Sequence, residues 1–86
     1  MKIDDREVAF GVLRAVVLAV ADSLPRRDVE SIWGLIDAGE PGVAFENLCT
    51  QLDEYEVSTN ESTRSDLAAV GDYLGIDARI WQELPR

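Results

Sequence analysis

The stretch "VESIWGLIDAGEPGVAFENL", residues 29–48, decides the fold because it contains one amphipathic helix, a stop and the start of a second. Its first half predicts a helix with one buried face, since apolar residues recur at i, i+3, i+4 and i+7: Val29, Ile32, Trp33 and Ile36. Gly39 is expected to end this helix, because glycine readily adopts the left-handed conformation found there. Pro41 suits the first turn of the next helix, where its missing N–H is not needed. So short a connection is typical of a helix bundle.

The helix that begins at Pro41 is expected to bury one face and to expose the other. At 100° per residue, its core-facing residues are predicted to be Ala44, Phe45, Leu48, Leu52 and Tyr55. Glu46 and Asp53 lie almost above one another on the far side, with Thr50 between them and Glu54 beside them. This helix is therefore predicted to present carboxylates to solvent along its length.

A preceding helix is expected from Asp4 or Asp5, either of which can act as its N-cap, to about Ala21. Apolar residues recur at helical spacing along it: Val8, Val12, Leu13, Val16, Val17 and Val20. Its part "AVVLAVA", residues 15–21, is apolar on all sides, which predicts a central helix covered by others. The β-branched residues there make a buried strand the alternative, but the longer helical periodicity favours a helix.

The C-terminal part predicts one more long helix and a short one. "STNE", residues 58–61, matches a capping box for a helix that holds Leu67, Val70 and Leu74 and ends at Gly75. Asp77 is then expected to cap a short turn that carries Ile80, Trp81 and Leu84. No stretch alternates with period two, so no sheet is predicted. We expect a single all-α domain over residues 1–86, a compact bundle of four helices plus a short C-terminal helix, with Trp33 and Trp81 in the core.

The negative charge of the chain is concentrated in one segment. The formal net charge is −9, and residues 40–61, here called the acidic segment, hold six acidic side chains and no Lys or Arg. A chain of this charge repels nucleic acids and anionic membranes and attracts basic partners. An exposed surface that serves only stability usually mixes both signs. The segregation therefore predicts recognition of a basic protein partner, and the alternative is an ordinary solvated face.

The residue types that most catalytic sites need are missing. There is no His, which excludes histidine triads and imidazole metal sites, and Cys49 has no His to act as its base. No glycine-rich phosphate loop is present. We therefore expect no enzyme, no cofactor and no metal site.

"DSL", residues 22–24, matches the motif that carries phosphopantetheine in acyl carrier proteins. Modification of Ser23 is one interpretation of it, and the other is that Ser23 caps the following helix.

The chain has the features of a cytoplasmic protein. Cys49 cannot form an internal disulfide, which fits a reducing compartment. The start "MKIDDRE" lacks the features of a secretory signal. The most apolar run, residues 8–21, is interrupted by Gly11 and Arg14 and is shorter than the roughly 20 residues that span a bilayer. The oligomeric state stays open, because the apolar first helix suits either a core or a dimer interface.

Residues 35–57, "LIDAGEPGVAFENLCTQLDEYEV", resemble the signature region of MafI-type small immunity proteins of bacterial polymorphic toxin systems. The pattern is an apolar helix ending in "I-D-x-G-E", then a "G-x-A-x-E-x-L" helix, then an acidic end after a tyrosine. The matching positions are Ile36, Asp37, Gly39, Glu40, Gly42, Ala44, Glu46, Leu48, Tyr55 and Glu56. Leu74-Gly75 and the late Trp81 fit as well.

The resemblance implies a cytoplasmic protein that binds and neutralises a cognate toxin domain, as in contact-dependent inhibition. Many such toxins are nucleases with basic clefts, to which an acidic inhibitor can offer carboxylates in place of phosphates. The expected partner contacts are Glu46, Asp53, Glu54 and Glu56, with Asp37 and Glu40 at the preceding turn. Tyr55 either anchors the partner at the edge of this surface or packs in the core. The alternative function is an acidic adaptor or dimerisation module without a toxin.

Overall fold

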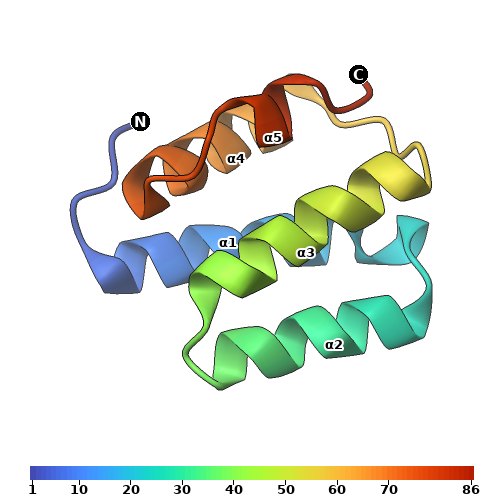
Figure 1. Cartoon of the computed structure of the whole chain (residues 1–86), viewed down its shortest axis with the longest axis horizontal. Helices are drawn as coiled ribbons and strands as arrows, with labels where there is room; N and C mark the ends of the chain where they lie inside the picture. The colour runs from blue at the N-terminus through green and yellow to red at the C-terminus, as the bar shows by residue number, and fades with distance from the viewer.

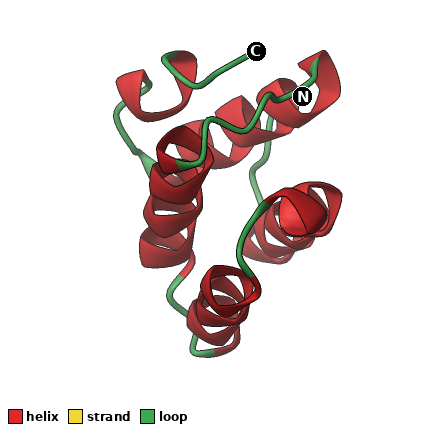
Figure 2. Cartoon of the chain, turned by 90° about the vertical axis from the view of Figure 1, so that its right-hand side faces the viewer, coloured by secondary structure: helices red, strands yellow, loops and turns green.

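A computed structural model describes all 86 residues and contains α-helices and no strand (Figure 1). The helices are α1 (Arg6–Val20), α2 (Arg26–Asp37), α3 (Pro41–Glu54), α4 (Glu61–Leu74) and the short α5 (Arg79–Gln82), with a 3₁₀ turn, η1 (Ala21–Ser23), after α1. This arrangement confirms the predicted all-α bundle of four helices plus a short C-terminal helix. Both termini lie on the side of α4 and α5, opposite α2 (Figures 1 and 2).

Helix α1 begins where the sequence predicts. The side chain of Asp5 caps it by accepting hydrogen bonds from the backbone N–H groups of Glu7, at 2.7 Å, and Val8, at 3.4 Å. The helix packs mainly against α4 and α3, and it buries Leu13 and Val17 against them. The strand alternative for this segment is wrong, because its residues follow the helical period throughout.

The expectation that residues 15–21 are covered on all sides is also wrong. Leu18 is 70% exposed, and Ala15 and Ala19 are exposed beside it. In a bundle this small, α1 has neighbours on one side only, so its opposite side faces solvent. Because the residues on that side are apolar as well, the sequence alone does not show that it is exposed.

The turn between α2 and α3 has the geometry that its glycine predicts. Gly39 adopts a left-handed conformation with φ 76°, and its N–H donates to the carbonyl of Ile36 at 3.0 Å. The N–H of Glu40 reaches back to the carbonyl of Leu35 at 2.9 Å, which completes a Schellman motif. Pro41 then opens α3 as expected. The connection places α2 and α3 side by side, and α3 buries Phe45, Leu48 and Leu52 completely (Figure 1).

Two of the predicted helix caps lie at other residues. Asn60, and not Ser58, caps α4, because its side chain accepts from the N–H of Thr63 at 2.8 Å. Thr59, in the expected cap segment, is instead buried and donates its hydroxyl to the carbonyl of Pro85 at 2.9 Å. Ser23 is also no cap, because it ends η1 and Pro25 directly precedes α2. Gly75 ends α4 as predicted, in the left-handed conformation.

The C-terminal segment is held against α3 and α4 by an aromatic ring and by one arginine. Trp81 packs on Gly71 of α4, and its ring lies edge-on to Phe45 of α3 with ring centroids 5.8 Å apart. Both tryptophans are half-buried against the core, as expected. Arg64 donates to the carbonyls of Leu84, at 3.0 Å, and Gln82, at 3.2 Å. These contacts fix the position of α5 beside α3.

Candidate functional site

The outer face of α3 carries three exposed carboxylates, Glu46 and, about two turns further on, Asp53 and Glu54, here called the acidic stripe. Thr50 lies between them and donates its hydroxyl to the carbonyl oxygen of Glu46 at 2.9 Å. None of the three carboxylates forms an ion pair, since the pairs within the chain are Arg26–Glu30 and Arg79–Asp77. The acidic stripe is therefore free to interact with a positively charged partner.

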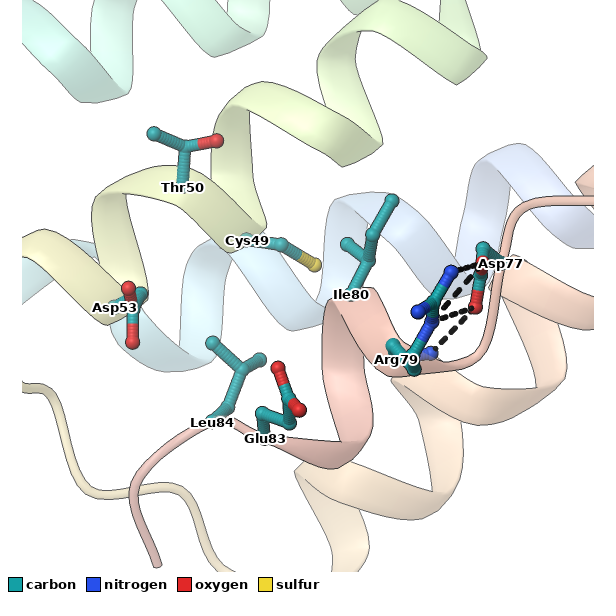
Figure 3. A pocket seen from close by; sticks show the side chains of 8 residues that line it. All are labelled: Cys49, Thr50, Asp53, Asp77, Arg79, Ile80, Glu83 and Leu84. Carbon is teal, nitrogen blue, oxygen red and sulfur yellow. Dashed lines mark hydrogen bonds and ion pairs between the residues drawn. The ribbon is translucent and has the colours of Figure 1, made fainter.

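A groove lies between the acidic stripe and α5, with a volume of about 490 Å³. This α3/α5 groove is lined by Cys49, Thr50, Asp53, Asp77, Arg79, Ile80, Glu83 and Leu84 (Figure 3). Three carboxylates and one guanidinium give the lining a net charge of −2. Asp53 belongs to both features, so the groove continues the acidic stripe toward the C-terminus.

One end of the α3/α5 groove is occupied by an ion pair. Nη2 of Arg79 lies 2.8 Å from Oδ2 of Asp77, and the backbone N–H of Arg79 donates to Oδ1 at 3.0 Å. These bonds lower the pKa of the Asp77 carboxyl and raise the pKa of the Arg79 guanidinium. Figure 3 shows this pair at one side of the groove and Asp53 at the other, with Glu83 between them in the view. Asp77 thus has part of the capping role that its sequence predicts, although Ala78 is the residue directly before α5.

The thiol of Cys49 is part of the wall of the groove and is not a reactive group. Cys49 is 2% exposed, and burial, with a smaller effect of the Glu46 charge, raises the pKa of its thiol to about 12. A thiol with this pKa stays protonated near neutral pH, whereas nucleophilic cysteines need the thiolate. Cys49 therefore contributes an apolar surface to the groove.

The remaining acids expected to contact a partner are exposed and lie at the two ends of α3. Asp37 and Glu40 are at the turn before α3, whereas Glu56 follows its other end. The 14 residues of α3 span about 21 Å at the helical rise of 1.5 Å per residue. The seven predicted contact residues therefore do not form one compact site. Their closeness in sequence overstated their closeness in space.

Tyr55 is exposed, and the prediction that it faces the core is wrong. Its side chain is on the far side of α3 from Glu46, since nine residues at 100° each amount to two and a half turns. The residue is 44% exposed, and its hydroxyl donates to Oδ2 of Asp28 in α2 at 3.3 Å. Burial by its surroundings and the charge of Asp28 raise the pKa of the phenol. Tyr55 follows the last turn of α3, where the core is no longer below it.

The groove residues in and around α5 were not predicted from the sequence to belong to a binding site. Asp77, Arg79, Ile80 and Glu83 follow the acidic stripe by more than twenty residues, so no local pattern links them to Asp53. The packing of Trp81 against Phe45 and Gly71, together with the hydrogen bonds of Arg64, brings α5 there. The sequence does contain Gly71 inside a helix and Trp81 near the C-terminus, but nothing in it shows that these two residues pack together.

The structure adds no residues to the other kinds of site that the sequence raised. No group of three or more His, Cys, Asp or Glu side chains is arranged to hold a metal ion. Ser23 is exposed on η1, immediately after α1. No helix has the length and apolar character needed to cross a bilayer.

Comparisons with protein-family models, curated proteins and solved structures gave no match for this chain. The resemblance to MafI-type immunity proteins therefore stays a prediction from the sequence.

Proposed function

We propose that this protein is a non-catalytic immunity protein that binds a cognate bacterial toxin domain through the acidic stripe and the adjoining α3/α5 groove. The observation that carries the proposal is the set of exposed carboxylates on α3 that have no cation of their own. A protein that uses its surface only for solubility has no need to keep one helix face free of Lys and Arg.

The chemistry of this face suits a basic partner, such as a nuclease whose cleft binds phosphates. Carboxylates and phosphates both accept hydrogen bonds from Arg and Lys, so Glu46, Asp53 and Glu54 can occupy the positions of successive phosphates or block the entrance beside them. No internal ion pair of these residues has to break before they bind. The partner in this proposal is a protein, and direct contact with nucleic acid or membrane is disfavoured by the net charge of −9.

The acids away from α3 are assigned a different role in this proposal. Asp37, Glu40 and Glu56 lie at the two ends of α3 and add to the negative field without sharing one contact site. Rim charges of this kind change association rates more than they change the lifetime of a complex. Tyr55, on the α2 side of α3, is outside the proposed contact site.

The proposal is tested by co-purifying the tagged protein with its partner from the native host and identifying the partner by mass spectrometry. Binding alone is not sufficient. Co-expression must also restore growth to cells that produce the partner. A triple variant of the acidic stripe, Glu46→Gln, Asp53→Asn and Glu54→Gln, is expected to lose protection.

The matched control for growth is Glu7→Gln, Asp22→Asn and Asp72→Asn, which removes the same charge from exposed positions on other elements. This control is expected to retain protection. A partner without toxicity, or equal protection by both variants, would contradict the proposed function.

A second candidate function, a dimerisation or adaptor module, is favoured by the outer face of α1. Val8, Ala15, Leu18 and Ala19 form an exposed face without charge there. Light scattering after size exclusion distinguishes the two candidates, because a dimer that Leu18→Glu converts to a monomer supports the module.

An intact mass equal to that of the unmodified chain would argue against a carrier function of Ser23.

A further inference from the structure

We propose that the α3/α5 groove binds an arginine side chain of the protein partner. The proposal rests on the proposed function for the nature of the partner, but the groove itself defines the chemistry of the occupant. Its two walls come from α3 and from the C-terminal segment, and they combine carboxylates with apolar surface (Figure 3).

The groove has an apolar part suited to an aliphatic stem. Cys49 and Leu84 are buried in its lining, and Ile80 is partly exposed there. The methylene groups of a long cationic side chain lie favourably on such a surface while the charged head stays near polar groups. Because Cys49 stays protonated, it adds no charge to this part.

The charged part of the groove has an excess of carboxylates over cations. Asp53 and Glu83 accept no hydrogen bond through their side chains and form no ion pair within the chain. The guanidinium of Arg79 is engaged at 2.8 Å by Asp77, so the net charge of the lining stays negative. A second guanidinium brought by a partner therefore meets Asp53, which has no cation, and Glu83, whose neighbouring cation Arg79 is already bonded to Asp77.

Arginine fits these features better than lysine. Its guanidinium is planar, weakly hydrated and able to donate to two carboxylates at once, whereas an ammonium is a compact, strongly hydrated charge. The volume of about 490 Å³ is in the range of ligand-binding pockets and also accommodates the residues that flank the arginine in a partner. Buried arginines are among the residues that contribute most to protein interfaces.

The groove is also positioned before a partner arrives. Trp81 packs on Gly71 and against Phe45, and Arg64 bonds to the carbonyl groups of the segment that follows α5. Glu83 is thus carried by a segment that is already fixed as the wall of the groove opposite α3. A preformed site lowers the ordering cost of binding.

The test is an NMR titration of the ¹⁵N-labelled full chain with N-acetyl-arginine amide at low ionic strength. Saturable shifts are expected for the backbone amides of Cys49, Asp53, Ile80 and Glu83. N-acetyl-citrulline amide has the same shape without the charge and is expected to cause no saturable shift. N-acetyl-lysine amide is expected to bind more weakly, and equal binding would overturn the assignment to arginine.

Two variants with the same change in charge locate the site. Asp53→Asn with Glu83→Gln is expected to weaken arginine binding about fivefold or more, within the range of two exposed charge pairs. Glu46→Gln with Glu54→Gln, on the same helix outside the groove lining, is expected to change it by no more than about twofold. Circular dichroism verifies that both variants fold.

Non-saturating shifts spread over all acidic residues, or equal effects of the two variants, would overturn the proposal. The outcome is independent of the proposed function, since the titration uses this chain and a small probe alone. If growth protection fails while the groove binds arginine, the immunity function is wrong and the groove assignment holds. If protection succeeds without arginine binding, the groove assignment is wrong.

Discussion

The indole of Trp81 lies against the backbone of Gly71, in the space that a side-chain carbon at position 71 would need. This contact allows α5 to approach α4 and lets the same ring reach Phe45 on α3. Glycine is otherwise unfavourable inside a helix, so its presence in α4 is explained by close packing. The α3/α5 groove depends on this contact, because it fixes α5, which carries Ile80 and is followed directly by Glu83.

Gly71→Ala is therefore expected to destabilise the protein by about 1–3 kcal/mol, the usual cost of overpacking a core. Gly11→Ala is the matched control, since Gly11 is also inside a helix but has nothing within 4 Å of its added carbon. It is expected to stabilise by about 0.5–1 kcal/mol through helix propensity. Urea unfolding measures both changes. Stabilisation by the two substitutions alike would show that Trp81 does not pack on α4.

A second prediction concerns Glu56, the one residue other than glycine with a positive φ, 49°. It ends α3 in a Schellman motif, in which the N–H of Val57 donates to the carbonyl of Leu52 at 2.9 Å. A left-handed conformation costs a side-chain-bearing residue roughly 1–2 kcal/mol. Part of this cost is recovered by glycine, although glycine also gains freedom in the unfolded chain.

Glu56→Gly is expected to be about 0.5–1 kcal/mol more stable than Glu56→Ala, with thermal unfolding as the measurement. The two variants lose the same charge, so their difference reports the backbone strain at position 56 less the extra freedom of glycine in the unfolded chain. Equal stabilities would show that position 56 is not left-handed in solution.

The helices were predictable from sequence because their apolar spacing and their stop residues agree. Gly39, Pro41 and Gly75 mark boundaries that the structure reproduces. The cap of α4 was placed two residues early, because Ser58 and Asn60 are both good capping residues. In the structure Asn60 caps α4, while Thr59 between them is bonded to Pro85. Both residue types suit a helix cap, and the local sequence does not show which of them is used.

The candidate site was predictable only in part. The period of α3 placed Glu46, Asp53 and Glu54 on its outer face, which the structure confirms. The same period placed Tyr55 toward the core, but the helix extends past the end of its neighbours' cover there. The groove beside Asp53 requires α5, and no pattern in the sequence specifies where so short a helix packs.

A third prediction uses two leucines of α1. Leu13 is 1% exposed, whereas Leu18 is on the uncovered side. Leu13→Ala is expected to lose about 2–5 kcal/mol of stability, the range for removing a buried leucine side chain. Leu18→Ala is expected to change stability by no more than about 0.5 kcal/mol, as at other surface positions. Comparable losses in urea unfolding would indicate that a second copy or another element covers Leu18.

A fourth prediction follows from the buried thiol of Cys49. Its pKa rises on folding from the ordinary value of 9.0 to about 12, chiefly through burial and then through the charge of Glu46. The folded state thus favours the protonated thiol. The resulting stability is fully present below about pH 9 and is lost as pH rises toward about 12.

The free energy of unfolding, measured with urea from about pH 8 to about pH 11, is expected to decline more steeply for the wild type than for Cys49→Ala. The slope is the measurement, because the substitution also leaves a small cavity that lowers stability at every pH. All other groups are the same in the two proteins, so their contributions cancel in the comparison. Parallel slopes would show that the thiol is as accessible in the folded state as in the unfolded chain.

The last prediction concerns the speed at which the acidic stripe finds a partner. If Glu46, Asp53 and Glu54 steer a basic protein, association should slow as salt rises, since screening limits exposed charges to about 10 Å at 0.1 M salt. The variant Glu46→Gln, Asp53→Asn and Glu54→Gln is expected to associate more slowly and with a flatter salt dependence. Its stability should change little, because all three side chains are exposed and unpaired.

Stopped-flow binding over a salt series, with the partner identified by co-purification, measures this effect. The control variant Glu7→Gln, Asp22→Asn and Asp72→Asn removes the same total charge from positions off α3, so it separates local steering from net charge. It is expected to bind at a rate closer to that of the wild type, because the field near the contact site is what accelerates association. If both variants slow association equally, only the net charge of −9 matters, and the acidic stripe is a solvated surface like any other.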